Sequence, residues 1–152
     1  MSTSLFRVEV MHGVNLDQLG RRDQAHYGSL TLAELEGQIR EDAAELRLDA
    51  RFFHTNHEGD FVEHLHSLRG EADGVLLNPG AWTHYAWSIR DALEIAAIPA
   101  IELHLSDVDA RESFRKVSVI GELCFATISG RGPEGYRQAL VQMRRELDGA
   151  GR

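Results

Sequence analysis

Apolar residues along the chain alternate between short continuous runs and longer stretches in which they recur every three or four positions. The short runs are typical of β-strands and occupy residues 5–11, 50–54, 74–78, 100–105 and 123–128. The longer stretches predict amphipathic helices over residues 31–46, 60–68, 83–96 and 135–147. Because strands and helices alternate, the pattern predicts an α/β domain with a parallel sheet covered by helices on both faces.

Two segments carry the clearest local signals. Thr31 followed by Glu34 fits a capping box, which marks the start of the helix over residues 31–46. Residues 74–78 form an uninterrupted apolar run that ends at Asn-Pro-Gly, as expected for a strand buried on both faces. The chain contains no repeat, low-complexity segment or linker, so we expect one domain over residues 1–152.

The connections that follow the strands all lie at one edge of such a sheet, where parallel α/β proteins bind their ligands. They are residues 12–30, 55–59, 78–84, 105–118 and 129–134. The first is much longer than the usual strand-to-helix loop of about 2–6 residues. A long loop at the ligand edge is typical of a lid over a binding site.

Composition narrows the classes of function. The 152 residues carry a net charge of −8, which argues against nucleic-acid binding. The single cysteine excludes an internal disulfide and a cysteine-rich zinc cluster. No apolar run approaches the ~18–20 residues of a membrane span, and the first residues do not resemble a signal peptide. We therefore expect a soluble, cytoplasmic, single-domain protein, and the net charge does not exclude binding of an anionic small molecule.

The long first connection contains a candidate base. Tyr27 follows Arg21 and Arg22, and a neighbouring positive charge lowers the pKa of a phenol. A tyrosinate would be a usable general base. A surface tyrosine that packs on the loop is the alternative.

The strand over residues 100–105 contains a candidate acid. Glu102 and His104 alternate along this strand and share a face. A carboxylate beside an imidazole selects its tautomer and raises its pKa, which makes a plausible proton donor. A strand-end histidine that bonds only to backbone is the alternative.

Candidate binding residues follow the next strand ends. Asn78 offers a donor and an acceptor to a ligand hydroxyl, although Asn before Pro is also a common turn residue. Ser106 and adjacent backbone amides could hold an anion. Arg111 and Arg115 lie four apart on a predicted short helix and could assist, or could simply form a solvated surface.

The remaining motifs indicate no metal or nucleotide site. His54 and His57 flank a turn, and His64 and His66, two apart on a helix, do not share a face. The Gly-rich residues 130–135 lack the Lys-Ser/Thr of a phosphate-binding loop. We therefore expect no bound metal.

Several segments resemble the type II 3-dehydroquinate dehydratase family, over about residues 6–145. They are HGVNLDQLGRR with YGS, TNHEGDFVEHLH, LLNPGAWTH, IRDAL, IELHLSDVDARESFR and GRGPEGYRQAL. The resemblance implies a flavodoxin-like fold with strand order 2-1-3-4-5. It also implies elimination of water from 3-dehydroquinate through an enolate, a step of the shikimate pathway, with no metal or organic cofactor.

The resemblance also implies roles for individual residues. Tyr27, activated by Arg22, would be the base, and His104, oriented by Glu102, would be the acid. Asn15 would hold a water that stabilises the enolate oxygen. The substrate would be bound by Asn78, His84, Leu105, Ser106 and Arg115, with Asp91 reaching a neighbouring subunit's site. The family assembles as trimers that build a dodecamer.

The sequence departs from the family pattern at several positions near these residues, among them Val14, Trp82, Trp87, Asp107 and Asp109. We expect Trp87, in place of a small residue, to displace its neighbours. Asp107 and Asp109 are expected to add negative charge where the substrate carboxylate should bind. Two alternatives therefore stay open: a paralogue that dehydrates a related cyclic hydroxyketone acid, such as an amino analogue, and a catalytically inactive binding module.

Overall fold

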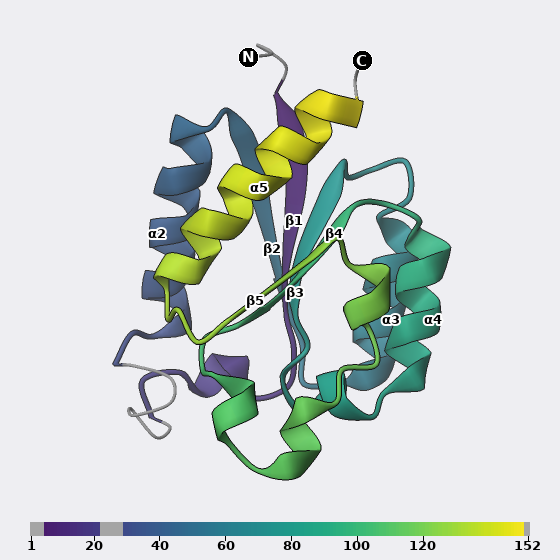
Figure 1. Ribbon diagram of the computed structural model, residues 1–152. Coiled ribbons are helices and arrows are strands. Elements are labelled where there is room, and N and C mark those ends of the chain that lie inside the picture. The colour runs from purple at the N-terminus through teal and green to yellow at the C-terminus, as the bar shows by residue number, and fades with distance from the viewer. Residues whose placement is uncertain (1–4, 22–28, 151–152) are drawn as a thin grey trace.

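The computed structural model describes residues 5–21 and 29–150 and contains a five-stranded parallel sheet (Figure 1). The strand order is β2-β1-β3-β4-β5, so the predicted flavodoxin-like topology is confirmed. The strands are β1 (Phe6–His12), β2 (Leu48–His54), β3 (Gly74–Asn78), β4 (Ala100–His104) and β5 (Ala126–Ser129). Parallel register places His12 beside Asn78 and His104 beside Ser129, so these residues end their strands at one edge.

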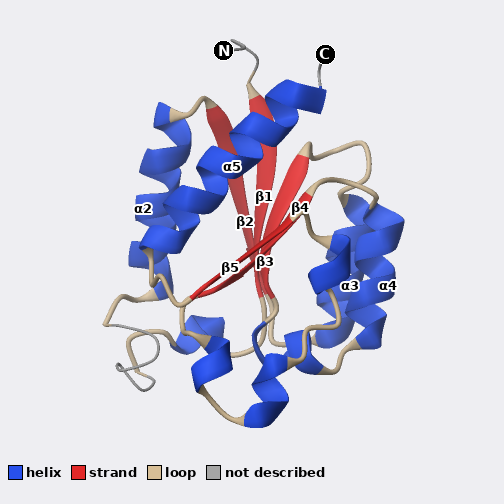
Figure 2. Cartoon of the chain, viewed as in Figure 1, coloured by secondary structure: helices blue, strands red, loops and turns tan. Residues whose placement is uncertain are grey.

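Helices cover both faces of the sheet (Figure 2). The helices α2 (Leu32–Glu45) and α5 (Glu134–Ala150) pack on one face, and α3 (Glu58–Ser67) and α4 (Trp87–Ala96) pack on the other. Every residue of β3 and β4 is buried, as the continuous apolar run in β3 predicts. Within the described residues, no helix combines the length and apolar character needed to cross a bilayer.

The start of α2 confirms the predicted capping box. The backbone N–H of Glu34 donates to Thr31 Oγ1 at 3.2 Å, and the backbone N–H of Thr31 donates to Glu34 Oε1 at 3.1 Å. Two amide groups that lack partners within the helix are thereby satisfied. The pattern over residues 31–46 therefore predicts both the helix and its first residue, Leu32.

The loops after β1 and β3 pack closely against each other, and this approach requires glycine at two positions. A Cβ on Gly13 would lie 2.2 Å from the Pro79 carbonyl oxygen, and one on Gly80 would lie 2.7 Å from the Val14 carbonyl oxygen. Gly80 also has φ +67°, which L-residues rarely adopt. The chain from Gly80 to His84 forms a 3₁₀ turn, so α4 begins at Trp87 and not at residue 83 as predicted.

The segment between β4 and β5 contains three 3₁₀ helices and no α-helix. They cover Val108–Ala110, Ser113–Lys116 and Gly121–Leu123. Because the last of these ends at Leu123, β5 begins at Ala126, three residues after the start of the apolar run at residue 123. This segment folds over the carboxyl ends of β3 and β4 and forms one wall of the site.

Candidate active site

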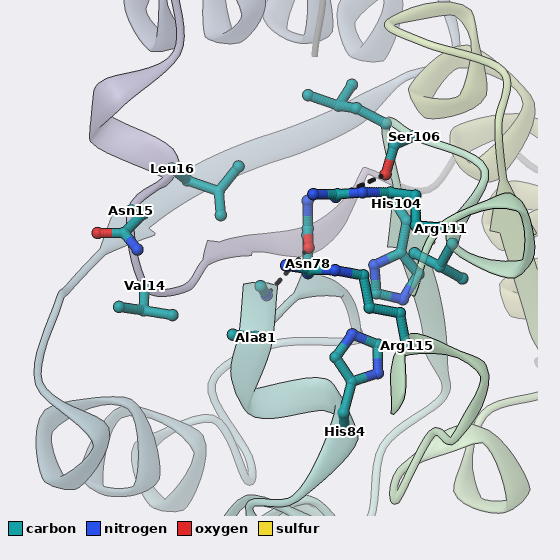
Figure 3. A pocket seen from close by; sticks show the side chains of 13 residues that line it. Val14, Asn15, Leu16, Asn78, Ala81, His84, His104, Ser106, Arg111 and Arg115 are labelled. Atoms are coloured by element: carbon teal, nitrogen blue, oxygen red, sulfur yellow. Dashed lines mark hydrogen bonds between the residues drawn. The ribbon is translucent and has the colours of Figure 1, made fainter. Parts of the chain in front are cut away.

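A pocket opens at the carboxyl ends of β1, β3 and β4 (Figure 3). The residues that line it are Val14, Asn15, Leu16, Asn78, Gly80, Ala81, His84, His104, Leu105, Ser106, Val108, Arg111 and Arg115. They include seven candidates from the sequence: Asn15, Asn78, His84, His104, Leu105, Ser106 and Arg115. Glu102 lies behind His104. Asp91 is exposed on α4, and Arg22 and Tyr27 lie outside the described residues.

His104 and Glu102 form the buried pair that their spacing predicts. His104 Nε2 donates to Glu102 Oε2 at 2.5 Å, and the hydroxyl of Ser118 donates to Glu102 Oε1 at 2.6 Å. Burial alone would raise the pKa of Glu102, but the hydrogen bonds from His104 and Ser118 and the charge of His104 lower it below its ordinary value. Glu102 is therefore a carboxylate, and His104 keeps its other ring nitrogen, Nδ1, for the pocket.

His84 reaches the pocket from the 3₁₀ turn after β3. Its Nδ1 donates to the Val117 carbonyl oxygen at 2.7 Å, and its ring lies nearly parallel to that of His104 at a centroid distance of 6.4 Å. Burial lowers the pKa of His84, the Val117 carbonyl opposes this, and the positive charges of His104 and Arg115 lower it further. His84 is thus a neutral imidazole with Nε2 available to a ligand.

Arg111 and Arg115 both line the pocket, but they do not share a helix as predicted. Arg111 ends the 3₁₀ helix Val108–Ala110, and Arg115 belongs to the next one. Arg111 Nη1 donates to Ser106 Oγ at 3.4 Å, and the Arg115 guanidinium lies 4.8 Å from the centre of the Phe114 ring. Arg111 lines the pocket as the sequence analysis considered possible, although the family resemblance assigns it no role.

The two asparagines are held by the backbone near them. Asn15 has φ 68°, a left-handed conformation that Asn tolerates, and its backbone N–H donates to Asn56 Oδ1 at 2.8 Å. Asn78 Oδ1 accepts from the Gly80 backbone N–H at 3.1 Å. Asn78 can therefore both form the turn and bind a ligand, because its side-chain oxygen stabilises the turn while the side chain also lines the pocket.

The structure places three of the residues that depart from the family pattern at the surface, and the expectation that Trp87 displaces its neighbours is wrong. The Trp87 side chain is 63% exposed and displaces nothing in the core. Asp107 caps the 3₁₀ helix Val108–Ala110 by accepting from the Asp109 backbone N–H at 3.1 Å. Both aspartates are exposed, and of residues 107–109 only Val108 lines the pocket.

Two histidines outside the pocket have buried or half-buried acidic partners that the sequence analysis did not identify. His12 is fully buried with Nε2 3.1 Å from Glu36 Oε2, and His64 Nε2 lies 2.6 Å from Glu9 Oε2. Both partners are distant in sequence, so no local pattern connects them. Across residues 5–21 and 29–150, no three His, Cys, Asp or Glu side chains form a group suited to a metal ion.

Comparison with known proteins identifies clear relatives. The family model described as dehydroquinase class II matches residues 6–144. The 3-dehydroquinate dehydratase of Syntrophotalea carbinolica is 46% identical over 136 residues, which cover 89% of this chain and 92% of that protein. The crystal structure of type II dehydroquinase from Propionibacterium acnes superposes with a TM-score of 0.89 at 36% identity, covering 95% of this chain and 99% of that one. A 3-dehydroquinate dehydratase-like protein from Bifidobacterium longum matches with a TM-score of 0.71 at 28% identity, over 93% and 98% of the two chains.

Proposed function

The chain belongs to the class II dehydroquinase family, and we propose that it eliminates water from 3-dehydroquinate to give 3-dehydroshikimate. The enzymes of this family are hydro-lyases, which eliminate water from their substrates. The observation that carries the proposal is the Glu102–His104 pair, which faces a pocket where Asn15, Asn78 and Arg115 also meet. An acid beside hydroxyl- and anion-binding groups is what dehydration of a hydroxylated carboxylic acid requires.

The first chemical step requires an anionic base. In this proposal the Tyr27 phenolate, with its pKa lowered by Arg22, takes a proton from the carbon next to the ketone. The electron pair of that C–H bond forms a carbon–carbon double bond, and the π pair of the carbonyl moves onto the ketone oxygen to give an enolate. Asn15 lines the pocket and would hold a water against this oxygen, where the charge develops. The roles of Tyr27 and Arg22 rest on the resemblance of their motif to the family.

The second step requires an acid because hydroxide is a poor leaving group. The enolate collapses to the conjugated ketone and breaks the C–O bond, and protonated His104 transfers the Nδ1 proton to the departing oxygen to form water. Glu102 stabilises the imidazolium through Nε2. A base with a lowered pKa and an acid with a stabilised charged form fit this pair of proton transfers.

The substrate carboxylate is placed at the backbone amides of Leu105 and Ser106. Arg111, which donates to Ser106 Oγ, adds a positive charge at this end of the pocket. Ring hydroxyls are assigned to Asn78, His84 and Arg115. The net charge of −8 therefore coexists with two guanidinium groups at the pocket, of which Arg115 is also paired with the exposed Glu112.

The chain is proposed to act in the cytoplasm as trimers that build a dodecamer, with Asp91 approaching a neighbouring subunit's site. Tyr85, Trp87 and Phe114 are exposed apolar side chains, and they are available to cover such a contact. Light scattering should give a mass far above 17.0 kDa. A monomeric mass would overturn both the assembly and the role of Asp91.

Product formation tests the whole proposal. The enone of 3-dehydroshikimate absorbs in the ultraviolet, so absorbance should rise when purified protein meets 3-dehydroquinate. Tyr27→Phe should lower kcat by several orders of magnitude, and a mild effect would remove Tyr27 from the role of base. No absorbance rise with the unmodified protein would overturn the proposed substrate. Tight binding of a modified cyclic acid without turnover of 3-dehydroquinate would then point to a paralogue with a related substrate.

A further inference from the structure

We propose that Ser118 is a positioning residue that holds Glu102 ionised and oriented, so that His104 can serve as the acid. Ser118 does not line the pocket and lies 16 residues from Glu102 in sequence. It belongs to the segment Val117–Val119, which follows the 3₁₀ helix that carries Arg115. The inference rests on the proposed function for the role of His104.

The direction of the Ser118 hydroxyl proton follows from its two contacts. The backbone N–H of Gly121 donates to Ser118 Oγ at 3.0 Å, and Ser118 Oγ lies 2.6 Å from Glu102 Oε1. An amide N–H can only donate, so it uses a lone pair of the hydroxyl. The single hydroxyl proton is therefore directed at Glu102, and the contact is a charge-assisted hydrogen bond.

This bond satisfies the half of the carboxylate that His104 leaves free. Glu102 is only 2% exposed, and its Oε2 already accepts from His104. Without Ser118, Oε1 would be a buried charged oxygen without this donor, which favours protonation or rotation of the carboxyl group. Either outcome would weaken the bond that sets the His104 tautomer and stabilises its charged form.

The segment around Ser118 is anchored on both sides. The Val117 carbonyl accepts from His84, the Val119 N–H donates to the Thr83 carbonyl at 2.8 Å, and Arg90 Nη1 donates to the Val119 carbonyl at 2.8 Å. Three consecutive residues thus hold His84 through a carbonyl and Glu102 through a hydroxyl. Both pocket imidazoles are therefore oriented from this one segment, His84 directly and His104 through Glu102.

The titratable groups around Glu102 decide the expected pH effect. His104 lies on the same strand, His84 approaches from the turn after β3, and Cys124 approaches from the segment before β5. Burial raises the pKa of Cys124 to about 12, and the charge of Glu102 contributes to this shift, so Cys124 stays an uncharged thiol. The hydrogen bond from Ser118 lowers the pKa of Glu102, and its removal should raise that pKa.

The test compares Ser118→Ala, Ser118→Thr and Ser113→Ala. Ser113 is exposed on the preceding 3₁₀ helix and serves as the matched control. We expect Ser118→Ala to lower kcat by about 10- to 100-fold, as for loss of a hydrogen bond to a charged group, with KM within about twofold. The acidic limb of its kcat profile should move to higher pH. Ser118→Thr keeps the hydroxyl and should recover much of the loss, and Ser113→Ala should resemble the unmodified enzyme.

A second readout does not depend on turnover. Imidazole ¹⁵N and downfield ¹H NMR signals should report a proton on His104 Nε2 in the unmodified protein, and this signal should shift in Ser118→Ala and return in Ser118→Thr. Absence of dehydratase activity in the unmodified protein would refute the proposed function, while the NMR comparison would still test the positioning of His104. If Ser118→Ala changes only thermal stability, with kcat, its pH profile and the His104 signal unmoved, the positioning role is wrong.

Discussion

Two carboxylate–histidine pairs in this chain have almost the same local geometry and very different surroundings. Glu102 and His104 approach to 2.5 Å at the carboxyl end of β4, and Glu9 and His64 approach to 2.6 Å between β1 and α3. Both carboxylates are 2% exposed. Residue types and distance therefore do not distinguish a pair that faces a pocket from a pair that only supports the fold.

The surroundings of the imidazoles do distinguish the pairs. His104 is the last residue of its strand and lines the pocket, whereas His64 lies flat on the Phe53 ring at a centroid distance of 3.8 Å. The second oxygen of Glu102 accepts from Ser118, whereas the second oxygen of Glu9 has no hydrogen-bond donor within the described part of the chain, only Arg7 Nη2 at 3.7 Å. Position at the sheet edge makes one pair available to a ligand.

The largest expected effect comes from exchanging the two histidines for glutamine. His104→Gln should lower kcat by about 10²- to 10⁴-fold, the usual contribution of a general acid. His64→Gln should leave kcat unchanged and lower the free energy of unfolding by about 1–3 kcal/mol through its contact with buried Glu9. Steady-state kinetics and urea unfolding of both variants measure the contrast. A comparable loss of kcat in His64→Gln would abolish the distinction between the pairs.

The second prediction concerns the dependence of stability on acidic pH, to which Glu102 should contribute. Its pKa in the folded protein is below its ordinary value of 4.5, so the unfolded chain binds the proton first as pH falls. The stabilisation is present above pH 4.5 and is lost as pH falls through the lower folded pKa. Urea unfolding between pH 6 and pH 3 should show a steeper loss of stability in the unmodified protein than in Glu102→Gln. Equal slopes would mean that Glu102 is not held as a carboxylate.

A smaller pH effect should come from His84. Partial burial lowers the pKa of His84 in the folded protein below its ordinary value of 6.5. Below pH 6.5 the unfolded chain therefore binds a proton at this residue before the folded chain does. Stability should therefore decline as pH falls from 6.5 toward the folded pKa, and His84→Asn should reduce that slope. The exposed His66 gives a matched control variant, His66→Asn, for the loss of one imidazole outside the pocket. Denaturant midpoints at half-unit pH steps would measure it.

The smallest effect is expected outside the pocket. Asp109→Asn removes the charge of an exposed side chain. The hydrogen bond to Asp107 is donated by the backbone N–H of residue 109, so the substitution keeps it. KM should change by less than about twofold, because surface substitutions usually change free energies by no more than ~0.5 kcal/mol. Arg111→Ala, inside the pocket and next to Ser106, should raise KM clearly more. A large decrease of KM in Asp109→Asn would show that its charge does reach the substrate.

Local patterns in the sequence determined the elements and part of the site. The Thr31–Glu34 capping box, the buried run over residues 74–78 and the shared face of Glu102 and His104 depend on spacings of two to four residues. Backbone periodicity sets these relations wherever the segment lies, so they can be derived without the fold. Parallel topology then brings the strand ends together at one edge, which is why seven of the candidate residues meet in the pocket.

Only the tertiary structure decided which partners complete those residues. Ser118 and Glu102 are 16 positions apart, and Glu9 and His64 are 55 apart, so no periodicity links them. The exposure of Asp107 and of Trp87 likewise depends on how distant segments pack around them. The physical reason is that hydrogen bonding and burial act through space. The sequence determines which residues can form such contacts, and the packing of distant segments selects the ones that do.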